Sequence, residues 1–252
     1  MEPPPGEPPP EKMGFMKMVS TGYEELVAAI IRPPRAEYDV SDLGERGVRI
    51  GPLSVVRQDL ELVGKRGKLQ CSHWEPGPGS RSEVELPCVI YMHGNCGCRA
   101  EALEILDLVL SGGMSLFAFD FGGCGMSEGE YISLGWWERE DLQAVIDHLR
   151  SRPEVSTIGL WGRSMGAVTA LLHGDRDPTI AGMVLDSPFS SLRVLANELV
   201  THFDYKVPKF AVSAALSMIK SSVKKRANFD LDELSPFCPP GTAETDDDEV
   251  YI

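Results

Sequence analysis

One stretch of the sequence, residues 157–173 (TIGLWGRSMGAVTALLH), constrains the fold more than any other. It joins a short apolar run, typical of a buried strand, to small helix-forming residues through a five-residue turn. That turn, Gly162-Arg163-Ser164-Met165-Gly166, matches the G-x-S-x-G nucleophile elbow. Gly162 and Gly166 would let the strand and the helix approach closely. An ordinary tight turn is the alternative, but the flanking strand and helix favour the elbow.

The elbow predicts chemical roles for two residues. Ser164 is the candidate nucleophile, because the turn would expose its hydroxyl at the carboxyl end of a strand. The backbone N–H of Met165 would lie in the first turn of the helix, where it has no partner inside the helix. We therefore predict Met165 as the first donor of an oxyanion hole.

The rest of the chain alternates strand and helix patterns. A hairpin is predicted first, from two alternating runs separated by Gly64-Lys65-Arg66-Gly67. The predicted strands are residues 55–63, 68–74, 86–92, 114–119, 157–161 and 180–185, and the predicted helices are 100–110, 141–149, the segment after Ser164, 192–203 and 209–227. This order predicts an α/β fold with a mostly parallel sheet and helices on both faces.

Four polar residues follow four consecutive predicted strands: His93, Asp120, Ser164 and Asp186. Ligands of parallel sheets bind at the carboxyl ends of the strands, so this edge is the expected site. Asp120 opens a glycine-rich turn (DFGGCGMS) whose spacing matches neither G-x-G-x-x-G nor a P-loop. We therefore predict that Asp120 is a structural residue beside the site, and that the turn is not a phosphate cradle.

The loop His93-Gly94-Asn95-Cys96-Gly97 follows the strand at 86–92. It is flexible enough to turn a backbone amide toward a substrate bound at Ser164, as a second oxyanion donor requires. We predict that the N–H of Asn95 or Cys96 is this donor. His93 and Gly94 are predicted to be structural, with His93 bracing the loop by hydrogen bonding.

Composition and charge exclude several classes of function. The net charge of the 252 residues is −14, but eight acids and no base lie in residues 229–252, which leaves −6 for the remainder. A nucleic-acid partner, which needs a basic face, is not expected. The six cysteines show no metal or redox spacing, so we expect no metal and no cofactor. The sequence starts without a signal-peptide pattern, and its longest apolar stretch, residues 210–219, is about half a membrane span, so a cytoplasmic protein without a transmembrane span is predicted.

The two ends of the chain differ from its middle. Residues 1–20 include six prolines before residue 12 and are predicted to be a disordered leader. Residues 235–252 are predicted to be a disordered acidic tail, which leaves 21–234 as the domain. Thr21 and Glu24 form a capping box before a short amphipathic helix with Tyr23, Leu26 or Val27, and Ile30 on one face. That face is expected to dock onto the domain, and a peripheral membrane contact is the alternative.

Several motifs together resemble the α/β-hydrolase fold, and more specifically the serine aminopeptidase S33-like hydrolases of plants, algae and protists. These motifs are IIRPPRAEY, QDLEL, CSHW, LPCVIYMHGN, GCRA, SLGWWERED, IGLWGRSMGAVTALL and IAGMVLDSPFSSL. The resemblance implies a small-molecule acyl substrate and an acyl-enzyme on Ser164. It also implies an acid and a histidine after two further strands.

Those two strands have no counterpart in the sequence after Leu234, which contains no apolar run and no histidine. The chain therefore reads as truncated, with the C-terminal strands of the fold missing. Asp186 lies where some members of the fold carry their acid, so it is a candidate for that role. We expect a serine hydrolase impaired by the loss of the usual acid and histidine. The alternative is a non-catalytic interaction protein that uses its proline-rich leader and its Val250-Tyr251-Ile252 ending, which a PDZ groove could accept.

Overall fold

The computed structural model describes residues 23–25, 27–189 and 209–234. Its strands are β1 (Gly47–Ile50), β2 (Leu53–Gly64), β3 (Gly67–Pro76), β4 (Leu86–Met92), β5 (Ser115–Phe119), β6 (Val155–Arg163) and β7 (Gly182–Asp186). Its helices are α2 (Leu103–Ser111), α3 (Glu138–Arg150), α4 (Met165–Gly174) and α6 (Lys209–Ala227), and its 3-10 turns are η1 (Val40–Leu43), η2 (Arg99–Ala102) and η3 (Leu231–Glu233). Residues 23–25 and 27–31 are also helical. The predicted helix at 192–203 and both predicted tails lie outside the described residues.

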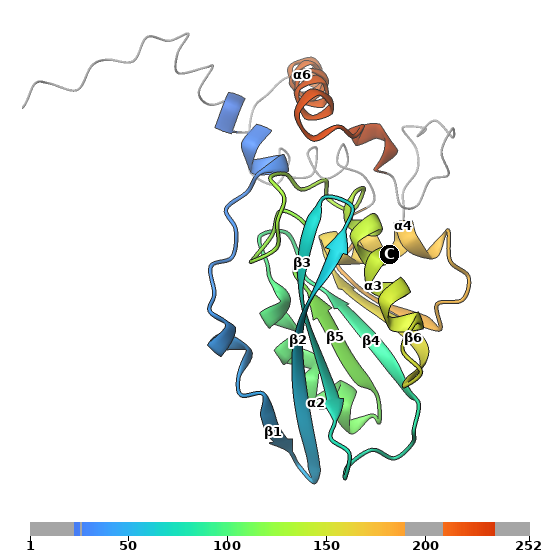
Figure 1. Ribbon diagram of the computed structural model, residues 1–252. Helices are drawn as coiled ribbons and strands as arrows, with labels where there is room; N and C mark the ends of the chain where they lie inside the picture. Colours follow the sequence, from blue (N-terminus) through green and yellow to red (C-terminus); the bar gives the residue numbers. More distant parts are fainter. Residues whose placement is uncertain (1–22, 26, 190–208, 235–252) are drawn as a thin grey trace, which may run out of the picture.

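The seven described strands form one sheet in the order β1-β2-β3-β5-β4-β6-β7 (Figure 1). β4 pairs in parallel with β5 and β6, and β6 pairs in parallel with β7. The pairs on the other side of β5 are antiparallel. β1 and β3 therefore run against the other five strands. This confirms the predicted α/β fold with a mostly parallel sheet.

Helices cover both faces of the sheet, and the alternation of side chains along each strand separates two apolar clusters. On β4, Ile90 and Met92 join the cluster that contains the buried stripe of α3. Tyr91, between them, points to the other face and joins the cluster formed with α2. This is the pattern of a strand buried on both faces, which the continuous apolar run at 86–92 predicts.

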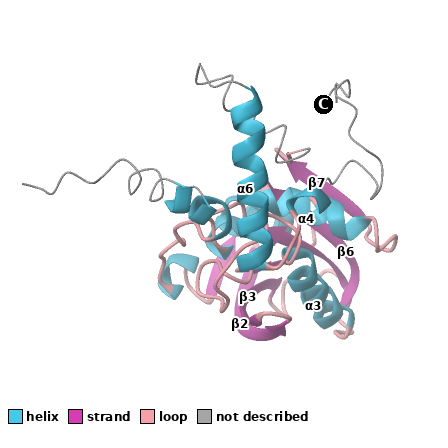
Figure 2. Cartoon of the chain, turned by 90° about the horizontal axis from the view of Figure 1, so that it is seen from above, coloured by secondary structure: helices cyan, strands magenta, loops and turns pink. Residues whose placement is uncertain are grey.

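The N-terminal helical residues dock onto the domain, as the amphipathic pattern predicts. Val27 and Ile31 are buried in the same cluster as α3. Tyr23 donates a hydrogen bond from its hydroxyl to the carbonyl of Met218 on α6, at 2.9 Å. In Figure 1, α6 lies above the sheet, and Figures 1 and 2 both show it beside this N-terminal segment. Thr21, the expected cap, lies outside the described residues.

Within the described ranges, none of the helices combines the length and the apolar character that crossing a bilayer requires. The same part of the chain contains no cluster of three or more histidine, cysteine or acidic side chains arranged to hold a metal ion.

Candidate active site

Ser164 is the single residue between the end of β6 and the start of α4. Its backbone adopts φ 50° and ψ −111°, a conformation that non-glycine residues rarely take. Two hydrogen bonds hold it there. Its N–H donates to the carbonyl of Asp186 at 2.7 Å, and its own carbonyl accepts from the N–H of Val168 at 3.0 Å. The turn is therefore fixed by β7 on one side and by α4 on the other.

The two glycines of the elbow leave no room for a side chain. A Cβ atom at Gly162 would lie 2.3 Å from the carbonyl oxygen of Gly166. A Cβ atom at Gly166 would lie 2.2 Å from the carbonyl oxygen of Met92, at the end of β4. Both neighbours are backbone atoms, so neither can move aside cheaply. The glycines thus bring β6, α4 and β4 into direct contact around Ser164.

Residues 93–99, here called the oxyanion loop after the role predicted for Asn95 or Cys96, pass next to Ser164. A Cβ atom at Gly94 would lie 3.8 Å from Cβ of Ser164, which is ordinary van der Waals contact. Asn95 and Cys96 are exposed, and Cys96 has a positive φ of 62°. On the other side of the serine, Met165 is the first residue of α4, so its N–H has no partner within the helix. Met165 thus adjoins Ser164, and Asn95 and Cys96 lie on the loop whose Gly94 contacts it.

His93 uses both ring nitrogens within the protein. Nδ1 lies 2.7 Å from the carbonyl oxygen of Gly94, and Nε2 accepts a hydrogen bond from the N–H of Phe121 at 3.1 Å. These contacts assign the neutral tautomer with the proton on Nδ1. The ring is buried and packs edge-on against Phe121. His93 therefore braces the oxyanion loop against the end of β5.

Asp120, also buried, accepts two backbone hydrogen bonds with its carboxylate. The donors are the N–H of Arg99, at 2.7 Å, and the N–H of Met126, at 2.9 Å. The first closes the oxyanion loop, and the second closes the glycine-rich turn after β5. Asp120 thus joins the loop to the turn.

Asp186 contacts Ser164 through its backbone carbonyl, whereas its carboxylate contacts other residues. Its carboxylate accepts from the hydroxyl of Ser187 at 2.8 Å and lies 3.8 Å from the guanidinium of Arg163. The carboxylate is about half exposed, with 52% of its side chain accessible. Among the described residues, no histidine forms a hydrogen bond with it.

The other three described histidines lie in structural positions. His73 is on β3, and its Nε2 is 3.1 Å from the hydroxyl of Ser115. Burial, and then the charge of Arg152, lowers the pKa of His73 to about 3. Burial likewise lowers the pKa of His148 on α3 and of His173 on α4, where His173 lies 3.5 Å from Asp177. None of these three hydrogen-bonds to Ser164 in the described structure, and His202 lies outside it.

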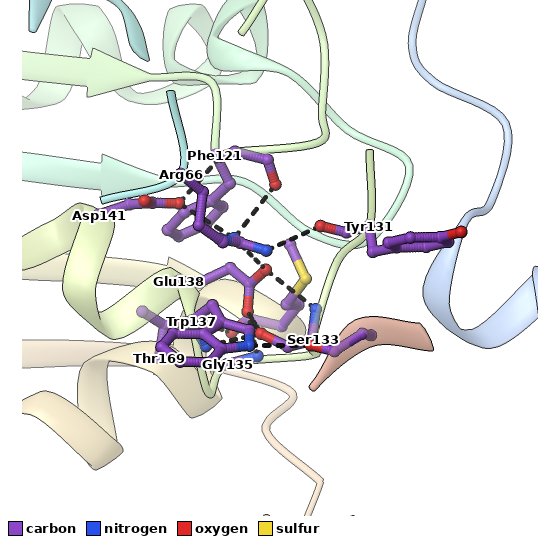
Figure 3. Close-up of polar contacts among 12 residues, drawn as sticks. Arg66, Phe121, Tyr131, Ser133, Gly135, Trp137, Glu138, Asp141 and Thr169 are labelled. Carbon is purple, nitrogen blue, oxygen red and sulfur yellow. Dashed lines mark hydrogen bonds and ion pairs between the residues drawn. The ribbon is translucent and has the colours of Figure 1, made fainter. Parts of the chain in front are cut away.

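The sequence did not predict a buried ionic cluster that includes the turn after β5. Figure 3 shows Arg66, from the turn between β2 and β3, reaching Glu138 at 3.1 Å and Asp141 at 3.3 Å on α3. Glu138 accepts from the hydroxyl of Ser133 at 2.5 Å, and Asp141 accepts from the N–H of Gly122 at 2.9 Å. The only sequence signal was the motif SLGWWERED, which holds both acids and Ser133.

The chain is similar to several known proteins. Residues 86–241, more than half of the chain, match the family described as Serine aminopeptidase, S33. The chain is 32% identical to the monoglyceride lipase of Rattus norvegicus over 198 residues, which cover 72% of the chain and 60% of the lipase. It is 26% identical to the uncharacterized protein YfhR of Escherichia coli K12 over 160 residues, covering 62% of the chain and 55% of YfhR. The chain thus spans 55% to 60% of the length of these relatives.

A solved structure shares the fold as well. The esterase Pf2001 of Pyrococcus furiosus superposes with a TM-score of 0.56 and 26% sequence identity. The match covers 75% of this chain and 68% of the esterase.

Proposed function

We propose, from the premise that this chain belongs to the serine aminopeptidase S33 family of α/β hydrolases, that it is a serine hydrolase with Ser164 as nucleophile. The observation that carries the proposal is the strained serine between β6 and α4, with Gly162 and Gly166 packed against backbone atoms. Its substrate would be a small molecule whose acyl group is bound as an ester, thioester or amide. The names of two similar proteins, a monoglyceride lipase and an esterase, support an ester.

The reaction would proceed through an acyl-enzyme. Oγ of Ser164 bonds to the carbonyl carbon while its proton passes to a base. The negative charge on the carbonyl oxygen is stabilised by the N–H of Met165 and by that of Asn95 or Cys96. The bond to the leaving group then breaks as the leaving group takes up a proton. A water molecule attacks the acyl carbon, which releases the acid and restores the serine.

The base is the part that the described residues do not supply. Each of the four described histidines is engaged in structural contacts away from Ser164, or is buried without reaching it. Asp186 has its carboxylate beside Arg163 and Ser187. An elbow and an oxyanion hole without a general base retain only a small part of the catalytic power. We therefore propose that hydrolysis by this chain is impaired.

A second candidate function follows from the same observation. If Ser164 has no base at all, the scaffold would act as a non-catalytic interaction protein. The two functions differ in the reactivity of Ser164, because a fluorophosphonate bonds to an activated serine and spares an inert one.

Three finer predictions are part of the proposal. The motifs of the sequence support the subgroup found in plants, algae and protists. The five cysteines of the described residues are free, and reduced thiols are typical of the cytoplasm. We propose that location, together with the domain limits of 21–234.

The test combines labelling with turnover. The chain and its Ser164→Ala variant are treated with a fluorophosphonate probe and are assayed on short p-nitrophenyl esters. We expect labelling that depends on Ser164 and ester hydrolysis barely above that of the variant. Equal labelling of both proteins would refute the assignment of Ser164 as the nucleophile. Rapid serine-dependent turnover would instead refute the impairment and direct the search for the base to His202.

A further inference from the structure

Tyr38 connects the N-terminal segment to the candidate site. It lies between the first helical segment and β1, yet its hydroxyl donates to Oδ2 of Asp120 at 2.6 Å, across 82 positions of sequence. Its ring lies against the guanidinium of Arg99, 5.5 Å from the ring centroid. Burial, and then the hydrogen bond to Asp120, raises the pKa of Tyr38, so the phenol stays protonated and remains a donor.

Asp120 receives this bond together with those that close the loop and the turn. Its Oδ1 accepts from the N–H of Arg99, while its Oδ2 accepts from Tyr38 and Met126 and lies 3.4 Å from the Arg99 guanidinium. A buried carboxylate with this many donors has one favoured orientation. Among the described residues, Tyr38 is the one neutral side chain that donates to this carboxylate. Removing its hydroxyl would leave the carboxylate freer to rotate.

The oxyanion loop depends on such external support. Its first residue, His93, is bonded to Phe121, and its last, Arg99, is bonded to Asp120. Between them, one backbone bond, from the N–H of Gly97 to the carbonyl of Gly94, stabilises the described loop internally. Cys96 is held at a positive φ, which is unfavourable for a non-glycine residue. The conformation of the loop is therefore imposed from its two ends by residues 120 and 121.

We infer that Tyr38 is a positioning residue, which acts through Asp120 to set the place of the oxyanion loop relative to Ser164. The inference rests on the proposed function for its effect on chemistry, because the loop carries the second oxyanion donor. The loop position itself can be measured independently of any reaction.

The experiment compares Tyr38→Phe with Tyr23→Phe in the full chain. Both variants remove one tyrosine hydroxyl from the N-terminal segment, but that of Tyr23 bonds to Met218 and Ser222 on α6, away from the loop. Two quantities are measured: the rate constant for phosphonylation of Ser164, and hydrogen exchange of the amides of residues 94–99. Melting temperatures verify that all three proteins are folded.

We expect Tyr38→Phe to slow phosphonylation by about tenfold, less than the loss of a whole oxyanion donor, and to speed exchange of the Arg99 amide. Tyr23→Phe should match the unmodified chain in both measurements. Unchanged phosphonylation in Tyr38→Phe, or a lower melting temperature with no change in either quantity, would overturn the inference. If Ser164 of the unmodified chain does not react, the proposed function fails, and amide exchange alone decides. Faster exchange in Tyr38→Phe only would then support the inference, and equal exchange would overturn it.

Discussion

Backbone strain is concentrated around Ser164. Five non-glycine residues of the described chain have positive φ, and one of them is Ser164 at the centre of the elbow. Two others, Cys96 and Ser187, lie on segments that contact it. Cys96 lies on the oxyanion loop. Ser187 follows Asp186, whose carbonyl accepts a hydrogen bond from the N–H of Ser164. Each such residue costs about 1–3 kcal/mol relative to ordinary backbone. The packing of the elbow must supply that energy, which makes its glycines sensitive positions.

Replacing Gly162 by alanine should therefore damage folding as well as chemistry. The new Cβ would lie 2.3 Å from a backbone oxygen, so β6 and α4 must move apart. Overpacking of this kind typically costs about 1–3 kcal/mol or more, and here we expect at least the upper end of that range. Thermal or chemical unfolding of the variant measures the loss.

Gly159→Ala, on the same strand, is the control. Its Cβ would meet only the carbonyl oxygen of Gly182, at 3.7 Å, so its stability should equal or slightly exceed that of the parent. If the two variants melted at the same temperature, the description of the elbow as closely packed would be wrong.

At the scale of secondary-structure elements, the ionic cluster of Arg66, Glu138 and Asp141 ties the β2–β3 turn to α3 and to the turn after β5. The cluster holds two buried carboxylates but one guanidinium. Oδ1 of Asp141 has no hydrogen-bond partner among the described residues. Burial, reinforced by the charge of Glu138, raises the pKa of Asp141 to about 6. The ionised form of Asp141 is thus a cost to the folded state.

The sign of the pH effect follows from the raised pKa. The favourable contribution of protonated Asp141 is complete below the unfolded pKa near 4, and it is lost as the pH rises through about 6. Asp141→Asn removes this loss. The free energy of unfolding of the variant, relative to the parent, should therefore rise between pH 4 and pH 8, by on the order of 2 kcal/mol. Denaturant titrations at several pH values measure this difference.

Asp147→Asn is the matched control, because Asp147 is exposed on the same helix. It controls for the loss of one acidic side chain from this helix. A difference for Asp141→Asn that does not change with pH would show that Asp141 is already compensated when charged.

Helices and strands whose residues show a clear local hydrophobic pattern were predicted well from the sequence. The stripe of Leu142, Val145, Ile146 and Leu149 is fully buried, as its helical spacing requires. β1 was missed because four residues, GVRI, are too short to show alternation, and their pairing with β2 is what makes them a strand.

Contacts between distant residues could not be predicted in the same way. Arg66 and Glu138 are 72 positions apart, and Tyr38 and Asp120 are 82 apart. No periodicity connects such pairs. The sequence motifs located Ser164 and predicted structural roles for His93 and Asp120, whereas the contact of Tyr38 with Asp120 became visible only in three dimensions.

At the scale of the whole molecule, the central strands of the described sheet are better covered than the edge strand β7. Its central strands lie between helices on both faces, but β7 is the last strand of the described sheet. Met183 and Val184 on β7 are 38% and 46% exposed. Within the described residues no strand pairs with the outer edge of β7. An unpaired edge with exposed apolar side chains is a template for pairing with another chain.

We therefore predict that the chain self-associates through β7 and that Val184→Lys weakens this association. A lysine on an edge strand places a charge where a second strand would dock, which is a common way for proteins to block edge pairing. Light scattering and analytical ultracentrifugation over a range of concentrations measure the effect, and the variant should stay monomeric at higher concentration. Val84→Lys is the control, since Val84 is 81% exposed in the bend before β4 and lies on no strand. Equal association of both variants would locate the contact elsewhere, whereas a selective effect at Val184 would identify the edge of β7 as the surface that makes this fold prone to associate.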